Sequence, residues 1–164
     1  MRHIISLLME NESGALSRVA GLFSARGYNI ESLNVAPTED PSLSRMTIVT
    51  TGSEQIIEQI TKQLNKLVDV VKLKDLTAGE HIERELMLVK VRAEDATRVE
   101  GFKALVANYG GKIIDESEDI CTAEITSDGV TLDRLLSEID RDDILETVRT
   151  GASGIFIGAR SLRI

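Results

Sequence analysis

Two successive stretches of this chain predict the same order of elements, strand–helix–strand–strand–helix–strand. In the first stretch, an apolar run without polar alternation is typical of a buried central strand, and three further strands follow. The predicted strands are 4–9, 30–36, 46–51 and 68–73. Apolar residues recur at helical spacing from Leu16 to Phe23, which predicts a helix that Gly27 can end. Ser53 can cap a second helix with an apolar stripe.

The second stretch repeats this order after a short polar segment. Its predicted strands are 86–91, 112–117, 120–126 and 144–150. One helix contains Val99 and Tyr109, and a second follows a cap at Thr131. The copies differ in their central hairpin, because the polar loop 37–44 of the first copy is replaced by the turn Glu118–Asp119 in the second. An internal duplication explains both the common order and this difference.

These patterns predict an α+β protein made of two tandem ferredoxin-like βαββαβ domains. In each domain, two helices would cover one face of a four-stranded antiparallel sheet. We expect a first domain over residues 1–76, a linker over 77–81 and a second domain over 82–164. Gly101 lies inside a predicted helix of the second domain, where glycine costs about 1 kcal/mol relative to alanine.

Charge and composition argue against several kinds of partner. The chain has 19 Lys and Arg against 27 Asp and Glu, with no long basic run, so we expect no nucleic-acid partner. Aromatic residues make up 3% of the chain, too few for a base-stacking surface. The apolar segment before Glu10 is too short for a secretion signal or a membrane span, and the single Cys121 suits a reducing compartment. A cytoplasmic protein with no membrane partner is expected.

The motifs of common catalytic sites are absent from the sequence. There is no G-x-S-x-G, no H-E-x-x-H and no G-x-x-x-x-G-K-[ST]. His3 and His81 have no cysteine or carboxylate at ligand spacing, so we expect exposed or capping residues. Cys121 lies in a predicted strand without a nearby histidine and is expected to be a small core residue. We therefore predict neither catalytic residues nor a metal site.

One segment, Asn11–Leu16, has a specific binding chemistry. Small residues stand directly before a helix, so the free N–H groups at Gly14 and the two residues after it, with the positive helix end, can hold a carboxylate. Gly14 leaves room for such a ligand because it has no side chain. The amides of Asn11 and Asn29 can accept from an ammonium group and donate to a carboxylate. The same turn is also compatible with a simple helix cap.

Five runs of residues in the first domain resemble the small, regulatory subunit of acetohydroxyacid synthase (acetolactate synthase). They are Glu10–Val19, Gly21–Phe23, Arg26–Leu33, Val35–Thr38 and Ser44–Thr47. The second domain resembles this family more loosely, from Glu83–Val91 to Arg149–Gly151, and the tail Phe156–Ile164 resembles it so loosely that we assign it no role. The resemblance implies that the first domain is an ACT domain and that two copies pair as a homodimer through these domains.

The resemblance also implies a site for a branched-chain amino acid, usually valine, between the paired ACT domains. By position, the implied effector-binding residues are Asn11, Gly14, Ala15, Leu16, Asn29, Ile30 and Ala36. The first four would hold the backbone groups of the ligand, Asn29 and Ile30 would face it from the partner subunit, and Ala36 would lie close by. Asn34 departs from the family, which commonly has threonine there. Leucine and isoleucine are expected to be weaker effectors, since one methylene changes binding in an apolar pocket by about 1–3 kcal/mol.

In this family, the chemistry belongs to a separate large subunit. The resemblance implies that this catalytic partner carries thiamine diphosphate, FAD and Mg²⁺, whereas the small subunit has no cofactor, raises the activity of its partner and confers feedback inhibition. Two alternatives are a free-standing amino-acid sensor, for which we find no basic DNA-reading helix, and a small enzyme with an unrecognised site. The second domain has Glu94–Ala96 in place of the Asn11–Gly14 turn, so we predict one ligand-binding domain per chain.

Overall fold

A computed structural model describes all 164 residues of the chain, which form two compact units. The first unit comprises Met1–Ile82 together with Ala152–Ile164, and the second comprises Glu83–Gly151. Both units have the element order β-α-β-β-α-β, so the α+β class and the two ferredoxin-like folds are confirmed.

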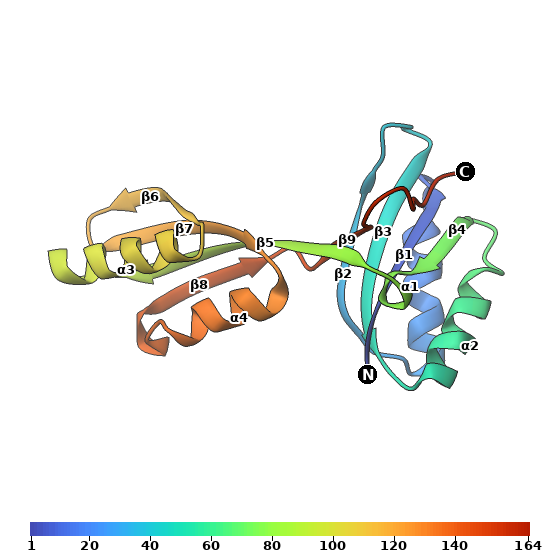
Figure 1. Cartoon of the computed structure of the whole chain (residues 1–164), viewed down its shortest axis with the longest axis horizontal. Helices are drawn as coiled ribbons and strands as arrows, with labels where there is room; N and C mark the ends of the chain where they lie inside the picture. The colour runs from blue at the N-terminus through green and yellow to red at the C-terminus, as the bar shows by residue number, and fades with distance from the viewer. The chain divides into compact units, whose positions relative to one another are not determined.

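The first unit has an antiparallel sheet in the order β2-β3-β1-β4. Its elements are β1 (Arg2–Glu10), α1 (Ala15–Arg26), β2 (Ile30–Pro37), β3 (Leu43–Thr51), α2 (Glu54–Leu64), β4 (Val70–Asp75), the 3-10 helix η1 (Leu76–Ala78) and β9 (Ser153–Phe156). Figure 1 shows α1 and α2 on the same side of this sheet. Ser53 accepts a hydrogen bond from the Ile56 N–H, which confirms the expected cap of α2.

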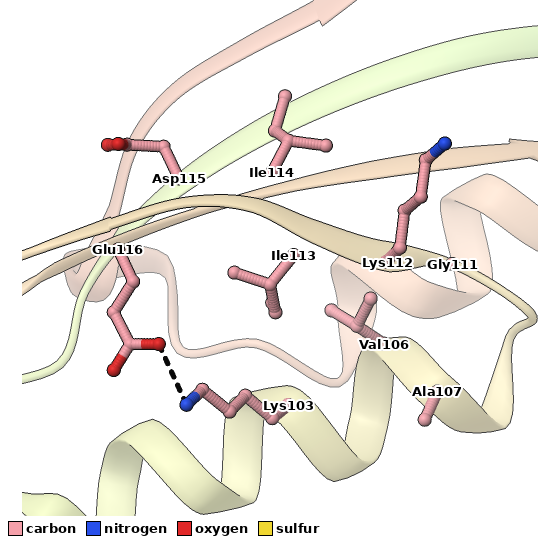
Figure 2. A pocket seen from close by; sticks show the side chains of 9 residues that line it. All are labelled: Lys103, Val106, Ala107, Gly111, Lys112, Ile113, Ile114, Asp115 and Glu116. Carbon is pink, nitrogen blue, oxygen red and sulfur yellow. Dashed lines mark ion pairs between the residues drawn. The ribbon is translucent and has the colours of Figure 1, made fainter.

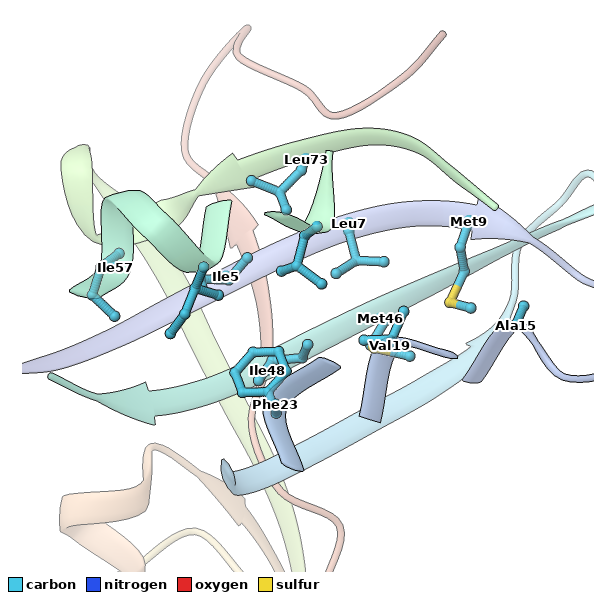
Figure 3. Close-up of a cluster of buried hydrophobic side chains, with 12 residues drawn as sticks. Ile5, Leu7, Met9, Ala15, Val19, Phe23, Met46, Ile48, Ile57 and Leu73 are labelled. Atoms are coloured by element: carbon cyan, nitrogen blue, oxygen red, sulfur yellow. The ribbon is translucent and has the colours of Figure 1, made fainter. Parts of the chain in front are cut away.

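The core of the first unit lies between its sheet and its two helices (Figure 3). The labelled side chains are Ile5, Leu7, Met9, Ala15, Val19, Phe23, Met46, Ile48, Ile57 and Leu73. Every residue of β1 from His3 to Met9 is buried, because both faces of this central strand are covered. Burial on both faces is the physical reason why its sequence shows no polar alternation.

The second unit has the corresponding strand order β6-β7-β5-β8. Its elements are β5 (His81–Arg92), α3 (Ala96–Asn108), β6 (Lys112–Ser117), β7 (Ile120–Ser127), α4 (Gly129–Ser137), the 3-10 helix η2 (Arg141–Asp143) and β8 (Ile144–Arg149). Alternate residues of β5 and β7 face the helices, among them Met87, Val89 and Cys121. The cap of α4 differs from expectation: Asp128 holds this position, because its carboxylate accepts from both the N–H and the hydroxyl of Thr131.

The C-terminal tail belongs to the first unit, whereas the sequence pattern assigns residues 82–164 to the second domain. The open face of the first sheet, away from its helices, carries Ile4 and Val49. Ala152 and Phe156 pack against them and against the buried Leu76, forming a second apolar cluster. This burial of apolar surface explains why a tail without a predicted role lies against the first sheet.

Residues 77–81, expected as a linker, are held by several contacts within the first unit. They contain the end of η1 and the first residue of β5. The Thr77 hydroxyl accepts from the Ile4 N–H at 2.9 Å, and the Thr77 N–H donates to Asp75 at 2.9 Å. The N–H of Ile157 in turn donates to the carbonyl of Glu80 at 3.1 Å. Residues 77–81 are therefore anchored by hydrogen bonds within the first unit.

Arg45 adds polar contacts between the tail and the open face of the sheet. Its guanidinium donates to the Ser6 hydroxyl at 2.5 Å and to the Gly154 carbonyl at 3.1 Å. Burial lowers the pKa of Arg45, and both acceptors are neutral. Gly154 must be small here, since a Cβ atom would lie 2.5 Å from Leu76 and 3.0 Å from Ile4.

Replacing Gly101 by alanine should stabilise the second unit. Gly101 lies inside α3, and a Cβ atom there would meet no other atom within 4 Å. We expect Gly101→Ala to raise the free energy of unfolding by about 0.5–1 kcal/mol, measured by urea titration with hydrogen exchange in the second unit. Gly111→Ala is the contrasting variant, because its Cβ would lie 2.9 Å from the backbone oxygen of Glu124. A loss of stability in Gly101→Ala would contradict this expectation.

Candidate functional site

The turn between β1 and α1 is fixed by its backbone and by Asn11. The Asn11 N–H donates to the Ser42 carbonyl at 2.8 Å, and its side-chain amide donates to the Pro41 carbonyl at 3.0 Å. Gly14 is the N-cap residue and adopts a left-handed conformation, with φ 86°. This N-cap has no side chain, and the nearest atoms to the place of a Cβ belong to the Arg18 guanidinium.

The N-terminus of α1 has no side-chain cap, unlike those of the other three α-helices. Ser53, Asp95 and Asp128 each accept a hydrogen bond from the first turn of α2, α3 and α4, respectively. In α1 no side chain does so, and the first turn contains no acidic residue. The Ala15 N–H donates to the Glu12 carbonyl at 3.2 Å and so is not free as expected, but no side chain of this chain accepts from the first turn or faces the positive dipole end of α1 as a cap.

Arg18 extends back from α1 over this turn, where it is paired with Asp69. Its Nε and Nη2 atoms donate to the two carboxylate oxygens of Asp69 at 2.5 and 2.9 Å. The Asp69 side chain is only 5% exposed, whereas that of Arg18 is 48% exposed. A Cβ atom on Gly14 would lie 2.9 Å from Arg18 Nη1, so the guanidinium borders the open space at Gly14. Sequence reasoning missed both residues, because nothing in the sequence pairs positions so far apart.

The Arg18–Asp69 ion pair makes the stability of the first unit depend on pH. The hydrogen bonds from Arg18 lower the pKa of Asp69 below its ordinary value of 3.8. Because the native state favours the ionised carboxylate, this stabilisation is present above pH 3.8 and is lost as the pH falls through the lowered pKa. We expect Asp69→Asn to remove this part of the acid sensitivity of the first unit, measured by unfolding at pH 2–6. An unchanged acid profile would contradict the assignment.

The other predicted site residues lie at both ends of α1. Ala15 is buried beneath the first turn, and Leu16 is 43% exposed beside it. Asn29 and Ile30 follow the opposite end of the helix, and a helix of 12 residues is about 18 Å long. One chain therefore brings Asn11, Gly14, Ala15 and Leu16 together and leaves Asn29 and Ile30 apart from them.

Ala36 lies near the end of β2, on the sheet face away from the helices. It pairs with Arg45, and Asn34 pairs with Thr47. Arg45 and Thr47 alternate with the core residues Met46 and Ile48, so Ala36 and Asn34 belong to the face opposite α1. β1 and β2 both run antiparallel to β3, so Ala36 is at the same end of the sheet as the Gly14 turn.

The second unit has a hollow of about 530 Å³ between α3 and β6, the counterparts of α1 and β2 (Figure 2). Lys103 and Glu116 form an ion pair of 2.7 Å beside it, and Ile113 lies between the helix and the strand. The N-terminus of α3 is already capped by Asp95, which accepts from the Arg98 N–H at 2.8 Å. The second unit therefore offers no open helix N-terminus of the kind found at Gly14.

The remaining candidate residues have structural contacts. Cys121 is buried, and burial raises the pKa of its thiol. His3 differs from expectation: its ring is buried, with Nδ1 3.1 Å from the Asp75 carboxylate. Its burial follows from the position of β1 at the centre of the sheet.

No group of three or more His, Cys, Asp or Glu side chains is arranged to hold a metal ion. None of the helices is both long and apolar enough to span a membrane.

Comparison with known families defines the class of this protein. Residues 5–72 match the family model described as the AHAS small subunit-like ACT domain. Residues 84–158 match the model described as the small subunit of acetolactate synthase. The chain is thus a two-domain protein whose first domain is an ACT domain.

Relatives along the whole chain specify the family further. The chain is 51% identical to the acetolactate synthase isozyme 3 small subunit of Escherichia coli, covering 99% of this chain and 100% of that one. It is 42% identical to the probable small subunit of Methanothermobacter thermautotrophicus, covering 98% and 95%. The small subunit structure from Thermotoga maritima matches with a TM-score of 0.85 and 37% identity, covering 94% and 96%. The chain belongs to the acetolactate synthase small-subunit family.

Proposed function

We propose that this chain activates a catalytic acetolactate synthase large subunit and confers feedback inhibition by binding valine at a dimer interface of ACT domains. The observation that carries the proposal is the open N-terminus of α1 at Gly14, bordered by the guanidinium of Arg18. Backbone N–H groups at a helix N-terminus bind carboxylates, and the α-carboxylate is common to all amino acids. Membership of a small-subunit family supports the large subunit as the partner.

The positions of Asn29 and Ile30 support a homodimer. They follow the opposite end of α1 from Gly14, so a site that uses both groups needs two chains. A second copy related by a two-fold axis would bring the end of one α1 to the start of the other. Valine at this interface would act by favouring an arrangement of low activity, and a coupling of about 1–3 kcal/mol gives strong inhibition.

The chemistry of the holoenzyme is assigned to the partner. Thiamine diphosphate, FAD and Mg²⁺ would reside in the large subunit. Condensation of pyruvate with pyruvate or 2-oxobutanoate would take place there, in the cytoplasm. The role of this chain is to bind the large subunit and to respond to valine, with leucine and isoleucine as weaker effectors.

Calorimetric titration of the full chain with amino acids tests the effector part of the proposal. We expect valine to bind with no more than one site per chain, because Asp95 already occupies the equivalent position in α3. Leucine and isoleucine should bind more weakly, and serine or aspartate should show no comparable affinity. Two equivalent valine sites per chain, or equal affinity for polar amino acids, would contradict the proposed site.

A further inference from the structure

We propose that Arg18 donates hydrogen bonds to the carboxylate of the bound effector and that Asp69 holds Arg18 in position, an inference that rests on the proposed function. The effector carboxylate would then lie between the backbone N–H groups of the first turn of α1 and Nη1 of Arg18. In this position it would take the place of the side-chain cap that α1 lacks.

The hydrogen bonds of Arg18 leave one end of its guanidinium free. Asp69 accepts from Nε and Nη2, whereas Nη1 makes no hydrogen bond within the chain. The free atom is the one nearest the N-cap, since a Cβ on Gly14 would lie 2.9 Å from Nη1 and 3.7 Å from Nη2. Two unused N–H donors of a fixed guanidinium therefore border the open space in front of the helix.

The hydrogen-bond donors at this place suit an anion. Asp69 and Glu12 both attract the charge of Arg18, but no side chain of this chain accepts a hydrogen bond from the first turn of α1. The positive end of the helix dipole therefore still faces this space without a side-chain cap. Because Asp69 is buried and holds two nitrogens of Arg18, it also fixes where the third nitrogen lies. A carboxylate ligand would meet a prepared set of donors.

The second unit supports this assignment because a carboxylate already occupies the equivalent position there. Asp95 is the N-cap of α3 as Gly14 is of α1, and its side chain accepts from the first turn. An arginine in that turn, Arg98, pairs with Asp143 at 3.2 Å. Asp143 directly precedes β8, as Asp69 directly precedes β4. The two units share an arginine–aspartate pair, and only the first lacks a carboxylate at the cap.

The test compares Arg18→Lys with the wild-type full chain by calorimetry. Lysine keeps a cation beside Asp69 and removes Nη1. We expect valine to bind between about 10-fold and 100-fold more weakly, the range for one lost charge-assisted hydrogen bond. L-Valinamide, which has a neutral amide in place of the carboxylate, should lose much less affinity. The matched control Arg98→Lys should bind valine as the wild type does.

A second variant separates binding from folding. Arg18→Met combined with Asp69→Leu leaves no unpaired charge at the site and should weaken valine binding similarly, with the fold verified by its melting transition. Wild-type affinity for valine in both variants would overturn the role of Arg18 and leave the proposed function standing. A wild-type chain that binds no branched-chain amino acid would overturn both. An equal loss for valine and valinamide would show that Arg18 acts only on the shape of the site.

Discussion

Replacing Gly14 by aspartate should abolish the response to valine while leaving the activation of the large subunit intact. The new carboxylate would stand beside Arg18 Nη1, in the space expected to hold the ligand carboxylate, and would repel it. Loss of the helix-terminal contacts together with this repulsion should weaken valine binding more than about 100-fold. Valine titration of acetolactate formation by the reconstituted holoenzyme measures the effect.

Gly110→Asp is the matched control for this variant. Gly110 also has a positive φ, 71°, and lies in the second unit after α3, where an added Cβ would meet no other atom within 4 Å. The control introduces the same side chain in the same type of backbone conformation, away from the expected ligand. A Gly14→Asp holoenzyme that keeps its sensitivity to valine would contradict the site. Loss of activation together with inhibition would show that the two functions share one surface.

Phe156→Ala should strongly destabilise the first unit. Phe156 is 7% exposed, in the cluster that joins the tail to the open face of the first sheet. The Arg160 guanidinium also lies 4.3 Å from the centroid of its ring. Removing a buried phenylalanine typically costs about 3–5 kcal/mol. We expect a loss of this size in the first unit, measured by hydrogen exchange resolved along the chain.

The neighbouring residue provides the control for this prediction. Ile155 is 57% exposed, so Ile155→Ala should change the free energy of unfolding by less than about 0.5 kcal/mol. If the two substitutions destabilise the first unit equally, the cluster around Phe156 does not hold the tail. Destabilisation confined to the second unit would also contradict the assignment of the tail to the first.

The sequence predicted those parts of the fold that leave periodic patterns. The apolar run at Ile4–Met9 and the repeated order of elements were sufficient for two ferredoxin-like folds. The turn at Gly14 stood out because small residues before a helix have a direct physical meaning. The tail left no such pattern: its buried residues Ala152 and Phe156 are isolated, and they contact a sheet that is distant in sequence.

Ion pairs between residues far apart in the sequence could not be predicted either. Arg18 and Asp69 look like ordinary surface charges when each is considered by itself. Only the fold brings the start of β4 beside α1 and shows that the aspartate is buried. His3 is a similar case, because its contact with Asp75 depends on the pairing of β1 with β4.

The proposed regulatory role is tested most directly by measuring acetolactate formation under three conditions. The cognate large subunit is assayed by itself, with this chain added, and with this chain and valine together. We predict that the chain raises the activity and that valine reverses this increase. Unchanged activity in all three conditions, with no complex between the two subunits, would contradict the proposed regulatory role.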